Sequence, residues 1–408
     1  MVSIPEYMDD LPAISGYEEE VAQARKNARR PIFLEESRID FGRIRSACAI
    51  ALHMHQPLIP AGGADLRTAG LIGNLEYMMN NPGIGDNHNA SVFAWCYKRM
   101  GEFVPQLIDE GKEPRVMLEY SGTLLHGLRK MGRGDVLDAL RTITTEPRFR
   151  RAVEWLGAPW GHAVAPSTPV QDFRHHVSAF QQHFAALFGM EALGRVRGFS
   201  PSEMALPNHP DVAYEFVKTL VDAGYDWVLV QEHTVERPET GTGPEQKHVP
   251  HLLTCRNSAG ESASIVAIVK TQGSDTKLVA QMQPFYEARS LSRVQFAGKS
   301  IPPLVTQIAD GENGGVMMNE FPPKFLEAMA EATDSETPAM NVTEYLEYLE
   351  TLGIGEADFT AIQPSMQKKI WDRMPDGGGP EKLAAVIEDC KQHAQPFHMD
   401  GGSWTSDI

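Results

Sequence analysis

Two histidines, an amide and a proline stand where an apolar stretch of the chain stops, in the segment His53–Pro57 (HMHQP). The stretch from Ile44 to Leu52 before it predicts a β-strand. Side chains two positions apart on a strand share a face, so we expect His53 and His55 to point the same way. Polar groups at the carboxyl end of a first strand are typical of a sugar site or a metal site in an α/β barrel.

Both kinds of site use histidine, so two interpretations stay open at this point. A zinc or iron site would need further histidines and an acid after later strands. His233 and Asp310 are the candidates, and the protein would then be a metal-dependent amidohydrolase or deacetylase. A sugar site would instead use the imidazoles as hydrogen-bond donors to hydroxyl groups.

Acidic side chains follow two other stretches that predict strands. Glu203 lies in a turn just after residues 195–199, and Asp310 and Glu312 stand among glycines after residues 304–309. If the strands belong to one parallel sheet, these acids share a rim with the histidines. Two carboxylates facing each other across a cleft are what glycoside hydrolysis requires, one as the nucleophile and one as the general acid and then base.

The elements that must position these residues alternate between strand-like and helix-like stretches, which favours a parallel α/β fold. After the first strand we expect strands at 115–120, 195–199, 226–231, 264–270 and 304–309, and helices at 17–30, 90–111, 177–188, 212–223, 323–332, 342–352 and 381–393. The predicted organisation is a polar, partly helical lead-in (1–43), a barrel (44–322) and a helical region (323–408).

Composition narrows the class of partner. The chain of 408 residues has 37 Lys and Arg against 54 Asp and Glu, a net charge of −17. Such a charge argues against a nucleic-acid or anionic-membrane partner and suits a neutral substrate. Four scattered cysteines, no signal-like start and no membrane-length apolar stretch lead us to expect a cytoplasmic protein.

The first motifs, in their order along the chain, resemble glycoside hydrolase family 57. The family opens with a strand end of the His-x-His-Gln-Pro type, which His53–Pro57 matches. Its second motif is a histidine followed by spaced prolines and an Asp-aromatic pair at a helix start. His162, Pro166 and Pro169 ahead of Asp172-Phe173 are similar to that motif.

Three later segments extend the resemblance, two of them with departures. Residues 198–203 resemble the motif that carries the nucleophilic glutamate, although Ser200 stands where a tryptophan is usual. Residues 310–315 resemble the acid/base motif, with Gly314 in place of an aromatic residue. Residues 402–407 resemble the last motif, which offers Trp404 and Asp407 to the sugar. Family members usually continue beyond this point, so we expect a truncated C-terminus.

The resemblance implies an incomplete (β/α)7 barrel with additional C-terminal helices and a retaining mechanism. Glu203 would be the nucleophile and Asp310 the acid/base, with their carboxyl groups ~5 to 5.5 Å apart. The residues expected to bind the sugar are His53, His55, Gln56, Trp160, His162, Glu312, Trp404 and Asp407, with Tyr120 as a further candidate for stacking.

The implied substrates are α-glucans such as glycogen, amylose and maltodextrins, cleaved by hydrolysis or transferred to another sugar, without a metal or other cofactor. The oligomeric state is not predicted. Two alternatives stay open: the metal-dependent amidohydrolase or deacetylase that would use His53 and His55, and a catalytically silent glycan-binding relative, which Ser200 and Gly314 would suit.

Overall fold

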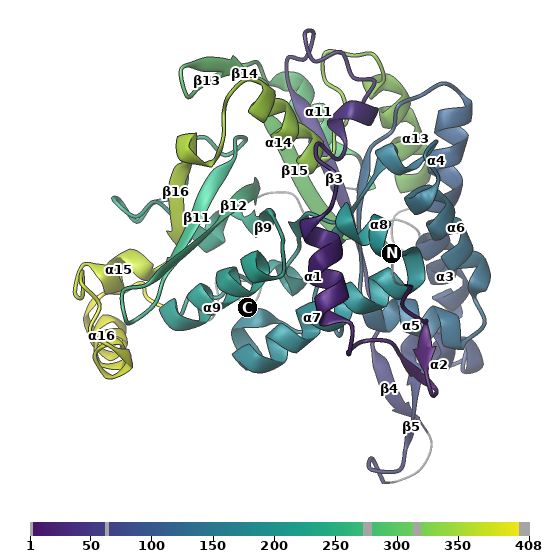
Figure 1. The fold of residues 1–408 in the computed structure, drawn as a ribbon, viewed down its shortest axis with the longest axis horizontal. Coiled ribbons are helices and arrows are strands. Elements are labelled where there is room, and N and C mark those ends of the chain that lie inside the picture. Colours follow the sequence, from purple (N-terminus) through teal and green to yellow (C-terminus); the bar gives the residue numbers. More distant parts are fainter. Residues whose placement is uncertain (1–2, 62–64, 272–279, 313–319, 400–408) are drawn as a thin grey trace.

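Seven parallel strands close into a barrel in the computed structural model, which describes residues 3–61, 65–271, 280–312 and 320–399 (Figure 1). In spatial order they are β12 (Ser262–Lys270), β15 (Leu304–Asp310), β3 (Ala47–Met54), β6 (Val116–Tyr120), β7 (Val153–Gly157), β8 (Gly198–Phe199) and β9 (Trp227–Gln231). The ring closes because β9 also pairs with β12. The predicted seven-stranded α/β barrel is therefore confirmed.

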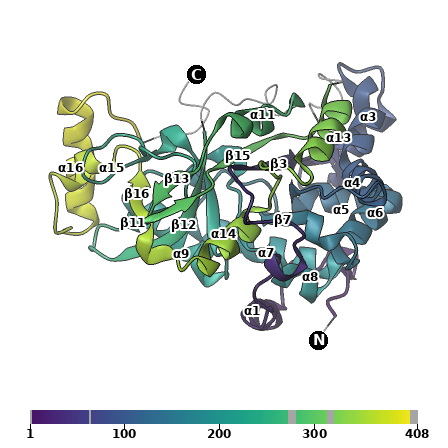
Figure 2. The same cartoon turned by 90° about the horizontal axis from the view of Figure 1, so that it is seen from above.

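Helices surround this barrel (Figures 1 and 2). They are α1 (Glu18–Lys26), α2 (Asn74–Asn80), α3 (Ala90–Lys98), α4 (Met100–Asp109), α5 (Gly122–Lys130), α6 (Gly134–Thr145), α7 (Val170–Phe188), α8 (Met190–Gly194), α9 (Pro210–Asp222), α11 (Gln283–Ser290), α13 (Phe321–Ala332), α14 (Val342–Thr351), α15 (Gln367–Trp371) and α16 (Pro380–His393). Both views place α3 to α6 on one side of the barrel and α15 and α16 at the other extreme.

Further strands lie outside the ring. The strands β11 (His251–Arg256), β16 (Thr360–Pro364) and β10 (Val235–Glu236) continue the sheet beyond β12. Three hairpins are separate from it: β1 (Tyr7–Met8) with β2 (Leu11–Pro12), β4 (Leu58–Ala61) with β5 (Gly70–Gly73), and β13 (Val294–Phe296) with β14 (Lys299–Ile301). The β4–β5 hairpin follows the segment His53–Pro57 and projects from the molecule (Figure 1).

The barrel strands are apolar on both faces, as expected where helices cover the outside and side chains fill the inside. On β3, Cys48, Ile50 and Leu52 pack with the residues of the surrounding helices, whereas Ala47, Ala49 and Ala51 belong to a second cluster. The second cluster also holds alternate residues of other barrel strands, so it is the barrel interior. Because alternate residues share a face, His53 continues the interior row of Ala47, Ala49 and Ala51.

The helix α14 closes the amino-terminal end of the barrel. Its Thr343 accepts a hydrogen bond from the indole of Trp227, at the start of β9 (3.0 Å). One residue on, Glu344 forms two hydrogen bonds with the guanidinium of Arg115 (2.9 and 3.1 Å), and both side chains are 1% exposed. With α14 packed across this end, the carboxyl-terminal mouth is where a site is expected in a barrel of this kind.

Removing the charge of Glu344 is expected to destabilise the protein. In Glu344→Gln the guanidinium of Arg115 would lose its buried carboxylate, which should lower the free energy of unfolding by about 3 kcal/mol. Chemical denaturation measures this change. The control Glu239→Gln makes the same substitution at an exposed position and should change the free energy of unfolding by less than about 0.5 kcal/mol. A loss below about 1 kcal/mol in Glu344→Gln would show that this pair does not hold α14 on the barrel.

Candidate active site

Three ionisable side chains lie side by side on adjacent strands at the carboxyl-terminal mouth. The strand register places Asp310, the last residue of β15, opposite His53 on β3, and His53 opposite Glu119 on β6. Each of them continues an interior row, because Ile308 and Met117, two positions earlier, belong to the interior cluster. The barrel therefore presents an acid, an imidazole and a second acid in one line across its mouth.

His53 is bonded through both of its ring nitrogens. Its Nδ1 bonds to the carboxylate of Glu119, which is 2% exposed. Its Nε2 lies 3.1 Å from Nε2 of His162, which follows β7. The ring of His55 in turn stacks on that of His162, with centroids 4.1 Å apart and planes at 14°. The three histidines predicted to bind the sugar are therefore brought together.

The loops after β7 and β8 both use left-handed backbone to reach this cluster. His162 has φ 58°, and the consecutive residues Glu203 and Met204 have φ 58° and 53°. Each such non-glycine residue costs of order 1–3 kcal/mol, and strain of this kind clusters at functional sites. The result is that Oε1 of Glu203 lies 3.4 Å from Nε2 of His162, with the Glu203 side chain 37% exposed.

The three imidazoles carry different charges. Burial alone would lower the pKa of His53, but the carboxylate of Glu119, followed by Glu312 and Asp310, raises this pKa to about 9. Burial, with the neighbouring histidines, lowers the pKa of His55 to about 3 and that of His162 to about 4. At neutral pH only His53 of the three is an imidazolium, so the 3.4 Å approach of His162 to Glu203 is not an ion pair.

Protonated His53 donates from both nitrogens, to Glu119 and to His162. Since Nε2 of His162 accepts this bond, the single proton of neutral His162 is on Nδ1. Its Nδ1–H is then the group that can donate to a ligand. His55 accepts or donates at Nδ1 with Oγ of Ser121 (2.8 Å), which leaves its Nε2 for a ligand.

Replacing Glu119 by glutamine is expected to lower the pKa of His53 by about 1–3 pH units, because an adjacent carboxylate charge is lost. The wild-type pKa of about 9 lies above the ordinary 6.5. The stabilisation from this pair is therefore fully present below about pH 6.5 and lost as the pH rises through about 9. Histidine NMR and the pH dependence of unfolding measure both effects. An unchanged His53 titration in Glu119→Gln would contradict this electrostatic account.

The turn after β15 is tied to the first strand end. Gly311 donates its backbone N–H to the carbonyl of His53 (2.7 Å) and accepts a bond from the guanidinium of Arg99 (2.6 Å). A Cβ at this glycine would fall 2.0 Å from the methyl carbon of Met54, so a larger residue here would require the end of the Met54 side chain to move. The carboxylate of Glu312 accepts the backbone N–H of His55 (3.1 Å), and burial raises its pKa to about 7.

Other predicted residues make contacts within the protein. Gln56 donates to the hydroxyl of Tyr97 (2.9 Å) and accepts from the amide of Asn74 (2.7 Å). Trp160 is half-buried and donates its indole N–H to Nδ1 of His183 (3.0 Å). Tyr120 is fully buried and donates its hydroxyl to the carbonyl of Tyr97 (2.8 Å), so its prediction as a stacking residue is wrong.

Two of the residues predicted to bind the sugar, Trp404 and Asp407, lie outside the described part of the chain, as does Gly314. The sequence analysis also missed Glu119, whose carboxylate raises the pKa of His53 and so keeps this ring protonated. A signal for it existed: Glu119 is a lone acid in the apolar strand Val116–Tyr120, and an acid there needs a buried partner.

The arrangement of the described side chains gives little support to the metal-dependent amidohydrolase or deacetylase. Among residues 3–61, 65–271, 280–312 and 320–399, no group of three or more His, Cys, Asp or Glu is arranged to hold a metal ion. Both nitrogens of His53 are engaged by other side chains, and His233 lies in a 3-10 turn after β9.

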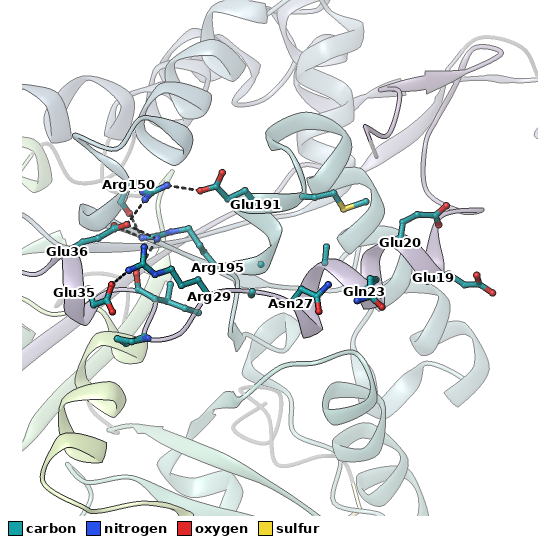
Figure 3. Close-up of a pocket in the computed structure, with 16 residues that line it drawn as sticks. Glu19, Glu20, Gln23, Asn27, Arg29, Glu35, Glu36, Arg150, Glu191 and Arg195 are labelled. Carbon is teal, nitrogen blue, oxygen red and sulfur yellow. Dashed lines mark hydrogen bonds and ion pairs between the residues drawn. The ribbon is translucent and has the colours of Figure 1, made fainter. Parts of the chain in front are cut away.

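A pocket of about 930 Å³ lies elsewhere, between α1 and α8 (Figure 3). Its residues Arg150 and Arg195 precede β7 and β8, so it is at the amino-terminal ends of these strands, opposite the histidine cluster. Arg150 pairs with Glu36 (2.6 Å) and Glu191 (2.8 Å), and Arg195 pairs with Glu36 (3.1 Å). Its arginines are neutralised by its own carboxylates, and no residue of the candidate site lines it.

A closed barrel of seven parallel strands with imidazoles and carboxylates at its carboxyl-terminal mouth defines an α/β-barrel protein with a polar site at the usual end. The model of glycosyl hydrolase family 57 matches residues 49–357, more than half of the chain. The chain belongs to that family, which confirms the resemblance of its motifs. No curated protein matches the sequence.

Solved structures share the fold at low sequence identity. The 4-alpha-glucanotransferase of Thermococcus litoralis is 17% identical with a TM-score of 0.53, over 86% of this chain and 47% of that one. The GH57-type branching enzyme of Pyrococcus horikoshii is 11% identical with a TM-score of 0.52, over 86% and 80%. The GH57 branching enzyme of Thermococcus kodakaraensis is 10% identical with a TM-score of 0.51, over 78% and 73%.

These identities support a shared fold alone, and the chain spans about half the length of the glucanotransferase. Within the described residues, none of the helices combines the length and the apolar character needed to cross a bilayer.

Proposed function

We propose that the protein is a retaining glycoside hydrolase or transglycosylase that acts on α-glucans, with Glu203 as the nucleophile and Asp310 as the acid/base. The observation that carries this proposal is the line from Asp310 through His53 and His162 to Glu203 across one barrel mouth. Family membership supports it, and so do the names of the similar structures, a glucanotransferase and branching enzymes.

The reaction proceeds in two displacements. The carboxylate of Glu203 attacks the anomeric carbon while Asp310 gives its proton to the departing glycosidic oxygen, which leaves a glycosyl ester on Glu203. Asp310, now ionised, takes a proton from water or from a sugar hydroxyl, whose oxygen attacks the same carbon and releases Glu203. Two inversions give net retention of configuration.

The neighbouring groups suit these roles. The positive charge of His53 lies opposite Asp310 on the neighbouring strand, where it offsets the negative charge that Asp310 carries between the two displacements. Neutral His162 and His55 hold donors and acceptors for sugar hydroxyls, bonds that can strengthen in the transition state. The ring of Trp160 offers an apolar face to a pyranose, since its N–H is already bonded.

The product profile from maltoheptaose and short amylose, with and without a chelator and in Glu203→Gln, tests the proposal. Cleavage or chain-length redistribution that a chelator does not affect and the variant lacks would support it. It would also show whether water or a sugar is the acceptor. Chelator-sensitive turnover would favour the metal-dependent alternative, and glycogen binding without turnover would favour a silent glycan-binding relative.

A further inference from the structure

The loop that carries Trp160, Gly161 and His162 rests on two histidines of α7. His176 and His183 are seven residues apart, which is about two helical turns, so they share a face of α7. Neither belongs to the motifs that led to the proposed function. Both accept hydrogen bonds from the loop through Nδ1.

The contacts of His176 fix the backbone of this loop. Its carbonyl accepts the N–H of Trp160 (3.1 Å), and its Nδ1 accepts the N–H of Gly161 (3.1 Å). A Cβ at Gly161 would lie 2.9 Å from Cε1 of His176, so the glycine permits this close approach. The following residue, His162, takes the left-handed conformation that turns its ring toward His53.

The contact of His183 fixes the indole of Trp160. Its Nδ1 accepts the indole N–H (3.0 Å) from a ring that is 3% exposed. From the other side, the carbonyl of Trp160 accepts the N–H of Thr123 (3.1 Å), and a Cβ at Gly122 would fall 2.0 Å from the indole Cδ1. Trp160 is therefore held between α5 and α7.

From these contacts, and resting on the proposed role of Glu203, we infer that His176 and His183 are positioning residues: they hold the loop that brings His162 within 3.4 Å of Glu203. Both act as neutral rings with the proton on Nε2. Burial lowers the pKa of each, that of His183 to about 3, so the bonds persist across the working pH range.

Matched substitutions separate positioning from packing. His183→Asn and His176→Asn keep an acceptor where Nδ1 stands, whereas His183→Leu and His176→Leu keep the bulk and lose the acceptor. We expect each leucine variant to lower kcat on maltoheptaose about 10- to 100-fold with little change in KM, since small displacements of a reacting group cost this much. Each asparagine variant should stay within about threefold of the wild type.

Either of two results would overturn the inference: leucine variants with kcat within about twofold of the wild type, or asparagine variants as impaired as the leucine ones. If a leucine variant does not fold, Trp160→Phe removes the same indole donor from the other partner and should give the same loss of kcat. Full activity in Trp160→Phe would overturn the role of His183.

A readout independent of activity separates this inference from the proposed function. In protein labelled with 15N-tryptophan, the indole N–H resonance of Trp160 should move in His183→Leu and stay near its place in His183→Asn. If the wild type acts on no α-glucan, the proposed function fails and positioning for that reaction fails with it. If the wild type is active and the resonance is the same in both variants, the positioning role alone fails.

Discussion

The variant Glu203→Gln is expected to lose at least about 10³-fold in kcat on maltoheptaose, because an amide cannot form the glycosyl ester. That loss corresponds to about 4 kcal/mol of transition-state stabilisation. The amide occupies the same volume and can still contact His162, so KM and the unfolding transition should stay close to those of the wild type. Initial rates and a thermal melt measure these effects.

Glu239→Gln is the matched control, since it makes the same change at an exposed position in the chain after β9. Its kcat should equal that of the wild type.

A smaller side chain in Glu203→Gly leaves room for azide, which should restore cleavage of an activated α-glucoside and give the inverted azide product. Activity in Glu203→Gln within about tenfold of the wild type would exclude Glu203 as the nucleophile.

The second large effect concerns the acid/base. Asp310→Asn should lower kcat on maltoheptaose by about 10²–10⁴-fold, the usual contribution of general acid–base catalysis. The loss should depend on the leaving group. A glucosyl fluoride needs no proton on its leaving group, so the first step should survive and the glycosyl-enzyme should accumulate. Stopped-flow bursts and steady-state rates distinguish the two steps.

Asp376→Asn changes an exposed aspartate far along the chain and serves as the control for this series. If Asp310→Asn affected fluoride and maltoheptaose equally, Asp310 would be needed for binding or folding, and another group would protonate the leaving oxygen.

The sequence located most of the barrel and missed one strand for a physical reason. Residues 44–52, 115–120, 226–231, 264–270 and 304–309 were predicted as strands, most of them from short apolar runs, and each contains or overlaps a barrel strand. The missed strand β7 has five residues with Glu154 near its start. The partner of that acid is the backbone and hydroxyl of Thr343, 189 positions away, so no local pattern explains a buried carboxylate there.

One expected helix is in fact two. Residues 90–111 read as a single amphipathic helix, but α3 ends and α4 begins around Arg99. The guanidinium of Arg99 is buried and donates to the carbonyl of Gly311, beside the acid/base candidate. Arg99 keeps helical dihedral angles (φ −57°, ψ −30°), so the interruption is slight, and Pro105 of α4, which has no backbone N–H to donate, lies close to it.

The candidate site divides in the same way. Residues at strand ends, such as His53 and Asp310, could be found because strand ends of a parallel barrel meet. Glu119 carried a signal, as a lone acid in an apolar strand, but that signal did not identify its partner. The helix residues His176 and His183 could not be found, because their roles lie in hydrogen bonds to a loop that only the fold brings near. Their residue types alone indicate core or helix surface.

The glycosyl-enzyme itself offers the most direct test of the central claim. A 5-fluoro-α-glucosyl fluoride should trap it, because the fluorine slows the second displacement more than the first. After digestion, mass spectrometry should find the added hexosyl group on the peptide that contains Glu203, and on no peptide from Glu203→Gln. An adduct on a different carboxylate, or steady consumption of maltoheptaose through an enzyme that forms no adduct, would contradict the account.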